Sequence, residues 1–260
     1  MEKPHTTTIQ VGGHACRVWR KGEGQKLGFI AGFGGLPKWT PFLDELAQHH
    51  EVVVPSLPGF PGGPPHRELD SHLDWLLATR DILEGAGLAE QHLVASSVGA
   101  ALLADVAAVW PTSVRRLVLM APFGLFDAAE PTADPWARRA DALPALLCQS
   151  PEHFVELRKP PADELDPISW HLEQTRAVEA SARFLFPLGD TRLAKRLPRI
   201  VAPTLLLWGE CDRVLPPRYA RRFSQLLGAA TEVQVIPNAG HLLELDAPQA
   251  AARAVENWLK

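Results

Sequence analysis

The sequence predicts an α/β fold: a doubly wound, mostly parallel sheet of eight strands, interrupted by one inserted helical subdomain. Three observations lead to this prediction. Short apolar runs alternate with helical patterns up to residue 126, the alternation stops between residues 127 and 199, and it then resumes to the end of the chain. Buried parallel strands joined by helices form doubly wound sheets, whose ligands bind at the carboxyl ends of the strands. We therefore expect a core made of 1–126 and 200–260, with an insertion at 127–199.

The composition is that of an ordinary globular protein, with 46% hydrophobic and 22% charged residues. The net charge of −4 argues against a nucleic acid partner, because phosphate binding needs concentrated positive charge. The three cysteines are widely scattered, which suits a reducing compartment, and their spacing is not that of a metal site. The N-terminus MEKPHTTT lacks the apolar core of a secretory signal, and polar residues interrupt the apolar stretch 93–110. We expect a cytoplasmic monomer or homodimer without a membrane span.

The expected strands begin with an antiparallel hairpin, 6–11 and 15–20, whose turn starts at Gly12-Gly13. The next two strands, 27–31 and 51–55, are apolar enough to be buried on both faces of a sheet. The remaining four have the same apolar character and lie at 93–95, 114–121, 203–209 and 231–236.

Helices are expected between these strands. In 71–83 the leucines share one stripe, and Gly85 and Gly87 follow as helix-closing residues. The loop 56–67 is rich in proline and glycine but opens no helix in the manner of a phosphate-binding loop. The other expected helices are 39–49, one from Val98 to Pro111, 217–227 and 248–259.

The insertion is too long for a structureless loop, so we expect a subdomain of several short helices separated by prolines. Near its end, basic residues surround Leu193 and Leu197, a pattern typical of a solvated helix face. Those basic residues are Arg192, Lys195, Arg196 and Arg199.

The stretch LVASSVGA, residues 93–100, joins a strand directly to a helix. A strand that turns at once into a helix crowds its own backbone, so only small side chains fit two residues either side of the corner. Ala95 and Gly99 are those small residues, and Ser97 lies midway between them. Alone, this pattern also describes an ordinary strand-to-helix corner with a capping serine.

Three further segments follow strand ends and carry chemistry-bearing residues. The glycine-rich run 31–35 reads Ala-Gly-Phe-Gly-Gly, Trp208-Gly209 leads to Asp212, and Asn238-Ala239-Gly240 leads to His241. A serine hydroxyl needs a base to take its proton and donors to receive the charge on the substrate oxygen. Asp212 and His241 supply the acid and the base, and the glycine loop offers backbone donors.

These four segments resemble motifs of the α/β-hydrolase family: G-x-S-x-G, W-G-x-x-D-x-x-x-P, G-H-x-x-x-x-E-x-P and H-G-F-G-G. The chain departs from them at Ala95, Asp246 and Ala31, which replace Gly, Glu and His. The resemblance implies Ser97 as nucleophile, His241 as general base and acid, and Asp212 as the acid that orients it. It also implies an oxyanion hole from the backbone N–H groups of Phe33 and Val98. Glu210 and Asp127 are the alternative acids.

The implied reaction is acyl transfer to Ser97 and then to water, with no metal or cofactor. In relatives the insertion is a cap over the active site, and here its aromatic residues suggest an apolar acyl pocket. We therefore expect hydrolysis of a carboxylic ester of an apolar acyl group. The pocket candidates are Phe126, Trp136, Trp170, Arg183 and Leu242.

Two other functions stay open. A C–C hydrolase resembling the meta-cleavage-product hydrolases would act on a diketo acid, whose carboxylate Arg158 or Arg183 could bind. That family usually has Asn before the nucleophile and an aromatic residue after the histidine, where this chain has Ser96 and Leu242. The second alternative is a ligand-binding receptor on the same fold that retains the three residues.

Overall fold

The computed structural model describes residues 3–162, 166–186 and 190–260. Its centre is an eight-stranded sheet in the order β1-β2-β4-β3-β5-β6-β7-β8. The first hairpin pairs antiparallel and β2 pairs antiparallel with β4, whereas every later pairing is parallel. The strands are β1 His5–Val11, β2 His14–Lys21, β3 Lys26–Ile30, β4 Glu51–Pro55, β5 Gln91–Ser96, β6 Val114–Met120, β7 Thr204–Gly209 and β8 Thr231–Ile236.

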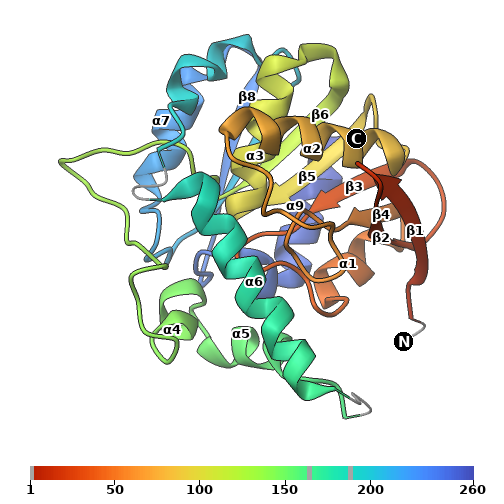
Figure 1. Cartoon of the computed structure of the whole chain (residues 1–260). Helices are drawn as coiled ribbons and strands as arrows, with labels where there is room; N and C mark the ends of the chain where they lie inside the picture. The colour runs from red at the N-terminus through yellow and green to blue at the C-terminus, as the bar shows by residue number, and fades with distance from the viewer. Residues whose placement is uncertain (1–2, 163–165, 187–189) are drawn as a thin grey trace.

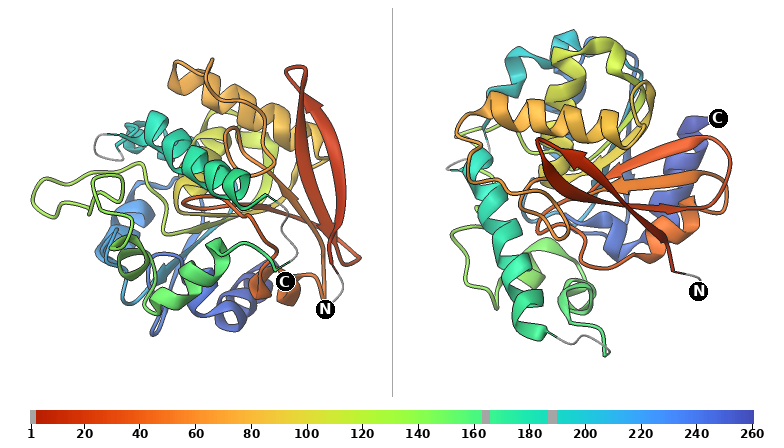
Figure 2. Two further views of the ribbon diagram at one scale, coloured as in Figure 1. Left: turned by 60° about the horizontal axis from the view of Figure 1, so that its bottom comes forward. Right: turned by 45° about the vertical axis from the view of Figure 1, so that its right-hand side comes forward.

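Helices cover both faces of this sheet. Figure 2 shows α1 and α9 against one face and α2 and α3 against the other. The helix α3 is buried along almost its whole length, because its residues are mainly alanine, valine and leucine. The core helices are α1 Pro41–Leu46, α2 His72–Gly85, α3 Ser97–Val109, α7 Arg218–Leu226, α8 Leu243–Asp246 and α9 Pro248–Leu259, with a 3-10 turn η1 at Pro111–Ser113. The predicted α/β fold class is thus confirmed.

The helix predicted over residues 39–49 is shorter in the structure. Its first helical residue is Pro41, with Thr40 in an extended N-cap conformation, so Trp39 lies outside it. At the other end, the backbone of Gly22 packs so closely against the carbonyls of Ala47 and His50 that a side chain there could not fit. The turn after Leu46 therefore lies directly against the loop between β2 and β3.

The segment between β6 and β7 contains α4 Leu143–Leu147, α5 Pro151–Arg158, α6 Pro167–Leu185 and the 3-10 turns η2 Leu193–Lys195 and η3 Leu197–Arg199. Figure 1 shows these three helices gathered on one side of the sheet, with α6 in front. The expectation of short helices is wrong for α6, which has 19 residues. Proline occurs at its first position and not again before its end, so nothing in its interior breaks it.

Three of the basic residues near the end of this segment, Arg192, Lys195 and Arg199, are exposed as expected, but no α-helix carries them. They lie on the two 3-10 turns and beside them, and Arg196 forms an ion pair with Asp105, a fully buried carboxylate of α3. His72 Nε2 lies 2.6 Å from the same carboxylate. A buried charge is tolerated only when it is paired, so Asp105 holds the returning chain against α3 and α2.

Candidate active site

Ser97 occupies the corner between β5 and α3. Its φ is +52°, a left-handed conformation that is costly for a residue other than glycine. Two residues later, a Cβ on Gly99 would lie 2.3 Å from the carbonyl oxygen of Ala31. The first turn of α3 therefore passes directly over the end of β3, and only glycine fits there.

Three side chains form one hydrogen-bonded chain at this corner. Ser97 Oγ lies 2.7 Å from His241 Nε2, and His241 Nδ1 lies 2.9 Å from Asp212 Oδ2. Ser97 and His241 have no exposed surface, and Asp212 is 6% exposed. The three residues come from the ends of β5, β7 and β8, which adjoin through β6 in the parallel part of the sheet. Parallel strands end at the same edge, which is why residues so distant in sequence meet there.

The second oxygen of Asp212 fixes how the carboxylate faces His241. Asp212 Oδ1 accepts the backbone N–H groups of Val214 at 2.8 Å and Leu215 at 2.9 Å. The carbonyl of Leu215 in turn accepts the indole N–H of Trp208 at 2.8 Å, so the loop is tied back to β7. Only Oδ2 is left to meet His241, which makes Asp212 an orienting group for the imidazole.

The glycine loop after β3 lies against the nucleophile. A Cβ on Gly32 would lie 2.9 Å from Ser96 Oγ and 3.1 Å from Ser97 Cβ, so the backbone needs glycine to come this near. The next N–H belongs to Phe33, and that of Val98 follows Ser97 at the positive end of the α3 dipole. These two donors are in the segments expected to hold a developing oxyanion.

Arg17 braces this loop, although Ala31 occupies the position where relatives have a histidine. Its Nη2 donates to the carbonyl of Leu36 at 2.9 Å, and its guanidinium lies 3.7 Å from the centre of the Trp19 ring. Burial lowers the pKa of Arg17 to about 10, which still leaves it charged at neutral pH. No periodic pattern in the sequence indicates this contact, because it joins β2 to the β3–α1 loop.

The two alternative acids are engaged elsewhere. Asp127 forms an ion pair with Arg222 of α7, and its backbone N–H donates to the Tyr219 hydroxyl. Glu210 Oε2 accepts the backbone N–H of Asn238 at 3.1 Å. Of the three candidate acids, Asp212 is the one hydrogen-bonded to His241.

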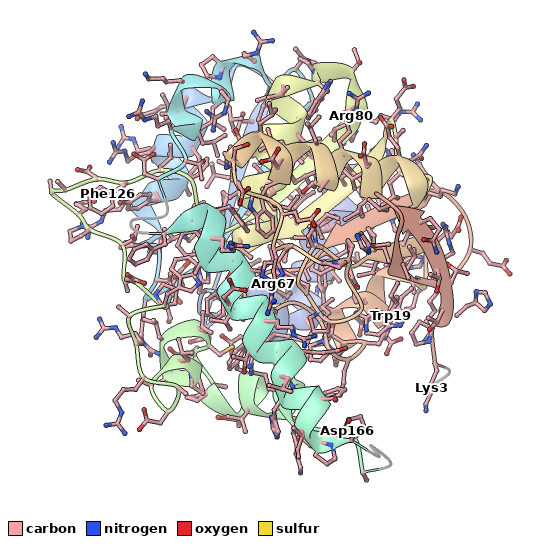
Figure 3. All side chains as sticks on the ribbon, viewed as in Figure 1. Lys3, Trp19, Arg67, Arg80, Phe126 and Asp166 are labelled. Carbon is pink, nitrogen blue, oxygen red and sulfur yellow. The ribbon has the colours of Figure 1, made fainter. Side chains whose placement is uncertain are left out.

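Two of the five pocket candidates lie beside the site. Leu242 Cδ2 packs on Gly32, and the Trp136 ring lies 5.8 Å from that of Phe33. The other three lie elsewhere. Trp170 donates to the carbonyl of Arg158, Arg183 bonds backbone carbonyls of the loop before α2, and Phe126 lies at the edge of the molecule in Figure 3.

A buried carboxyl that the sequence reasoning missed lies close by. Glu244 is 5% exposed, and burial raises its pKa to about 7, although the Ser96 hydroxyl and nearby His241 act in the opposite direction. An acidic residue inside the apolar run Leu242–Leu245 was the available signal. Among residues 3–162, 166–186 and 190–260, no three His, Cys, Asp or Glu side chains converge to hold a metal ion. None of the helices described could cross a membrane.

Comparison with known proteins identifies the family of this chain. Residues 29–254 match the model of the alpha/beta hydrolase family. The chain belongs to this family. Proteins similar to this alpha/beta hydrolase include a 2-hydroxy-6-oxo-2,4-heptadienoate hydrolase of Pseudomonas putida, 25% identical over 96% of this chain and 95% of that protein. Lipase 3 of a Moraxella species is 26% identical over 88% of this chain and 75% of its own length.

The fold of this alpha/beta hydrolase is also found in a solved structure. A 2-hydroxy-6-oxo-6-phenylhexa-2,4-dienoate hydrolase from a Rhodococcus species superimposes with a TM-score of 0.78, covering 99% of both chains at 18% identity. At 18% identity the similarity shows a shared fold and nothing about the reaction. The relatives of this alpha/beta hydrolase thus include a lipase and a 2-hydroxy-6-oxo-2,4-heptadienoate hydrolase, and the protein is a hydrolase.

Proposed function

We propose that this protein is a serine hydrolase that cleaves a carboxylic ester of an apolar acyl group. The observation that carries the proposal is the hydrogen-bonded chain from Ser97 through His241 to Asp212. In this arrangement the histidine takes the proton of the serine hydroxyl, which makes the serine oxygen a nucleophile. Such an arrangement is recognised by its geometry rather than by sequence position.

The reaction begins when Ser97 Oγ attacks the ester carbonyl while His241 Nε2 takes its proton. The carbonyl oxygen gains negative charge, which the N–H groups of Phe33 and Val98 stabilise. His241 then protonates the departing alcohol oxygen, and an acyl-enzyme remains on Ser97. A water molecule, deprotonated by His241, then attacks the carbonyl of the acyl-enzyme. The resulting tetrahedral intermediate collapses, releases the acid, and Ser97 Oγ takes the proton back from His241.

Asp212 acts through His241. Its carboxylate accepts a hydrogen bond from Nδ1–H, which holds the imidazole proton on Nδ1 and leaves Nε2 free to receive the proton of Ser97. The positive charge that His241 gains during attack is stabilised by the same carboxylate, in a site from which water is excluded.

Apolar surroundings support the choice of acyl group. The Phe123 ring lies 5.4 Å from the imidazole of His241, and the Trp136 ring packs on both Phe123 and Phe33. Their rings favour hydrocarbon over charged groups. Segment 127–199, which supplies Trp136, would serve as the cap of this site.

The test uses p-nitrophenyl esters from acetate to octanoate and a fluorophosphonate probe. Wild-type protein is expected to hydrolyse several of these esters with multiple turnovers and to be labelled on Ser97. Ser97→Ala should lose at least ~10⁴-fold in turnover while remaining folded. Absence of hydrolysis across the whole series would exclude the esterase, and labelling without turnover would favour the ligand-binding receptor.

A second candidate, hydrolysis of a C–C bond in a diketo acid, is favoured by the position of Arg158. Its Nη1 would lie 2.9 Å from a Cβ placed on Gly34, so the guanidinium adjoins the oxyanion loop. Burial lowers the pKa of Arg158, and no carboxylate among the described residues forms an ion pair with it. Arg183, by contrast, is held by the carbonyls of His66 and Arg67. A substrate carboxylate would pair with Arg158.

Arg158→Gln and Arg183→Gln form a matched pair for this alternative. If the substrate is a ring-fission diketo acid, Arg158→Gln should raise KM at least about tenfold, the effect of losing one charge-assisted hydrogen bond, and Arg183→Gln should not. No turnover of such acids by the wild type, together with ester hydrolysis, would leave the esterase alone.

A further inference from the structure

The candidate nucleophile is sealed from solvent. Ser97 and His241 are both 0% exposed. An ester carbonyl must come within about 3–3.5 Å of the attacking oxygen, so no substrate reaches Ser97 in this conformation. Some group that now covers the site must move aside before the reaction.

Rings cover the site in a layer. Phe123 meets His241 edge-on at 5.4 Å, and Trp136 lies 5.5 Å from Phe123 and 5.8 Å from Phe33. Phe33 and Phe123 are 2% and 1% exposed, whereas Trp136 is partly exposed. Trp136 is therefore the outermost ring of this cluster. Phe33 and Phe123 follow core strands, whereas Trp136 comes from the segment between β6 and β7.

One hydrogen bond holds the Trp136 ring in place. Its Nε1–H donates to Ser181 Oγ of α6 at 3.1 Å, and the Ser181 hydroxyl donates to the carbonyl of Val178 at 2.8 Å. Ser181 is itself fully buried, so this acceptor has a fixed position. The bond connects the ring that covers the site to the longest helix of the inserted segment.

The chain around Trp136 is bonded to the core on one side. Before it, the backbone N–H of Ala133 donates to the carbonyl of Val214 at 2.9 Å, in the loop that also holds Asp212. Asp134 Oδ1 accepts the backbone N–H groups of Trp136 at 2.8 Å and Ala137 at 3.1 Å, so residues 134–137 form one local turn. After this turn, the chain runs to the start of α4 without regular secondary structure. A rotation of the Trp136 side chain on this turn leaves the bond from Ala133 to the core in place.

We propose that Trp136 is a movable plug over the oxyanion loop and His241, latched by Ser181, and that its displacement sets the largest acyl group admitted. The proposal rests on the proposed function in that Ser97 is taken as the nucleophile and an acyl group as the part of the substrate that enters. When the Trp136–Ser181 bond breaks, the indole leaves Phe33 and Phe123, and the space that it vacated receives the acyl chain.

The test measures how fast Ser97 reacts with a small and a long-chain fluorophosphonate. Ser181→Ala and Trp136→Phe each remove the latch but keep a ring, so both should speed labelling by the two probes alike, by roughly three- to tenfold. Trp136→Ala removes the plug, so the long-chain probe should gain at least about tenfold over the small one.

Trp170→Phe is the matched control, because Trp170 also donates its indole N–H, at 2.7 Å, to the carbonyl of Arg158 within the inserted segment. It should leave both labelling rates unchanged. If Trp136→Phe and Trp170→Phe change the labelling rates equally, the effect is a general loosening of the segment. If the labelling rates stay unchanged in Ser181→Ala and Trp136→Ala, Trp136 does not control access to the site. Either result overturns the proposal.

A second measurement is independent of hydrolase chemistry. In a Ser97→Cys background, alkylation of the introduced thiol by iodoacetamide and by a bulky maleimide, followed by peptide mass spectrometry, reports access alone. The same ordering of the Ser181 and Trp136 variants is expected there. If wild-type Ser97 fails to react with either fluorophosphonate but the alkylation rates in the Ser97→Cys background follow this order, the proposed function is wrong and the plug stands.

Discussion

The carboxylate of Asp246 accepts the backbone N–H of Gly240, the residue before His241, at 2.8 Å. The same side chain accepts the N–H groups of Gln149 at 2.7 Å and Ser150 at 3.1 Å, where α5 begins. His153 Nδ1 lies 3.1 Å from it. One buried carboxylate therefore joins the loop that carries the candidate base to the segment between β6 and β7. His241 follows Gly240 directly, so the position of the imidazole depends on this loop.

Asp246→Asn should lower both stability and turnover. An amide cannot accept on both sides, so at least one of the buried N–H groups loses its partner, at a cost of about 1–3 kcal/mol. Urea unfolding measures this loss, and kcat on an active ester should fall roughly tenfold or more as the Gly240–His241 loop shifts. Asp141→Asn, which changes a fully surface pair with Arg139, is the control. A variant Asp246→Glu that restores kcat would support the positioning role, whereas loss of stability with unchanged kcat would contradict it.

Asp212→Asn should keep the fold and lose activity. The amide oxygen can still accept the N–H groups of Val214 and Leu215, so the amide nitrogen is directed at His241 Nδ1. His241 must then carry its proton on Nε2, where it can no longer accept from Ser97, and kcat should drop about 10⁴-fold. Ester kinetics with a thermal unfolding curve measure both effects. Asp127→Asn should change kcat little, and a larger loss there would make Asp127 the orienting acid.

Gly99→Ala should destabilise the protein. The added methyl would lie 2.3 Å from the Ala31 carbonyl, and backbone atoms cannot move aside without displacing β3 or α3. We expect a loss of at least about 2 kcal/mol in the free energy of unfolding. Gly85→Ala is the matched control, since its nearest neighbour is the end of the Ile9 side chain at 3.1 Å. That substitution lies in α2 and should be neutral or stabilising within about 1 kcal/mol. Equal effects at the two positions would contradict this account of the corner.

Glu244 should make stability depend on pH. Its pKa is raised in the folded protein to about 7 from an ordinary value of 4.5, so the folded state binds the proton more tightly than the unfolded state. Stability should therefore fall as pH rises from 4.5 to 7, by on the order of 3 kcal/mol at most, and then stay level for this group. Glu244→Gln removes the ionisation, so its stability relative to wild type should increase over the same range. Urea unfolding at pH 5 and pH 8 measures the difference, and a pH-independent difference would contradict it.

Much of the fold was predictable because its signals are local. The strands 51–55 and 231–236 and the helix 248–259 have the predicted bounds, since each is an apolar or amphipathic run closed by turn residues. The bounds of α1 and the length of α6 were not predicted correctly. The chain after α1 packs against Gly22, a contact between separate elements that no local pattern indicates, and α6 continues because no proline lies in its interior.

The sequence by itself determined the order of strand ends and the residue at each one. Small residues around Ser97, glycines in the loop after β3 and Gly240 before His241 are local requirements of backbone geometry. Only the tertiary structure decided which acid meets His241, since Asp127 and Asp212 both follow strands and differ in what surrounds them. It also decided that Arg17 braces the loop, that Asp246 joins two segments and that Trp136 packs on Phe33 and Phe123. These contacts connect elements far apart in the chain, so their geometry arises from packing and leaves no periodic pattern in the sequence.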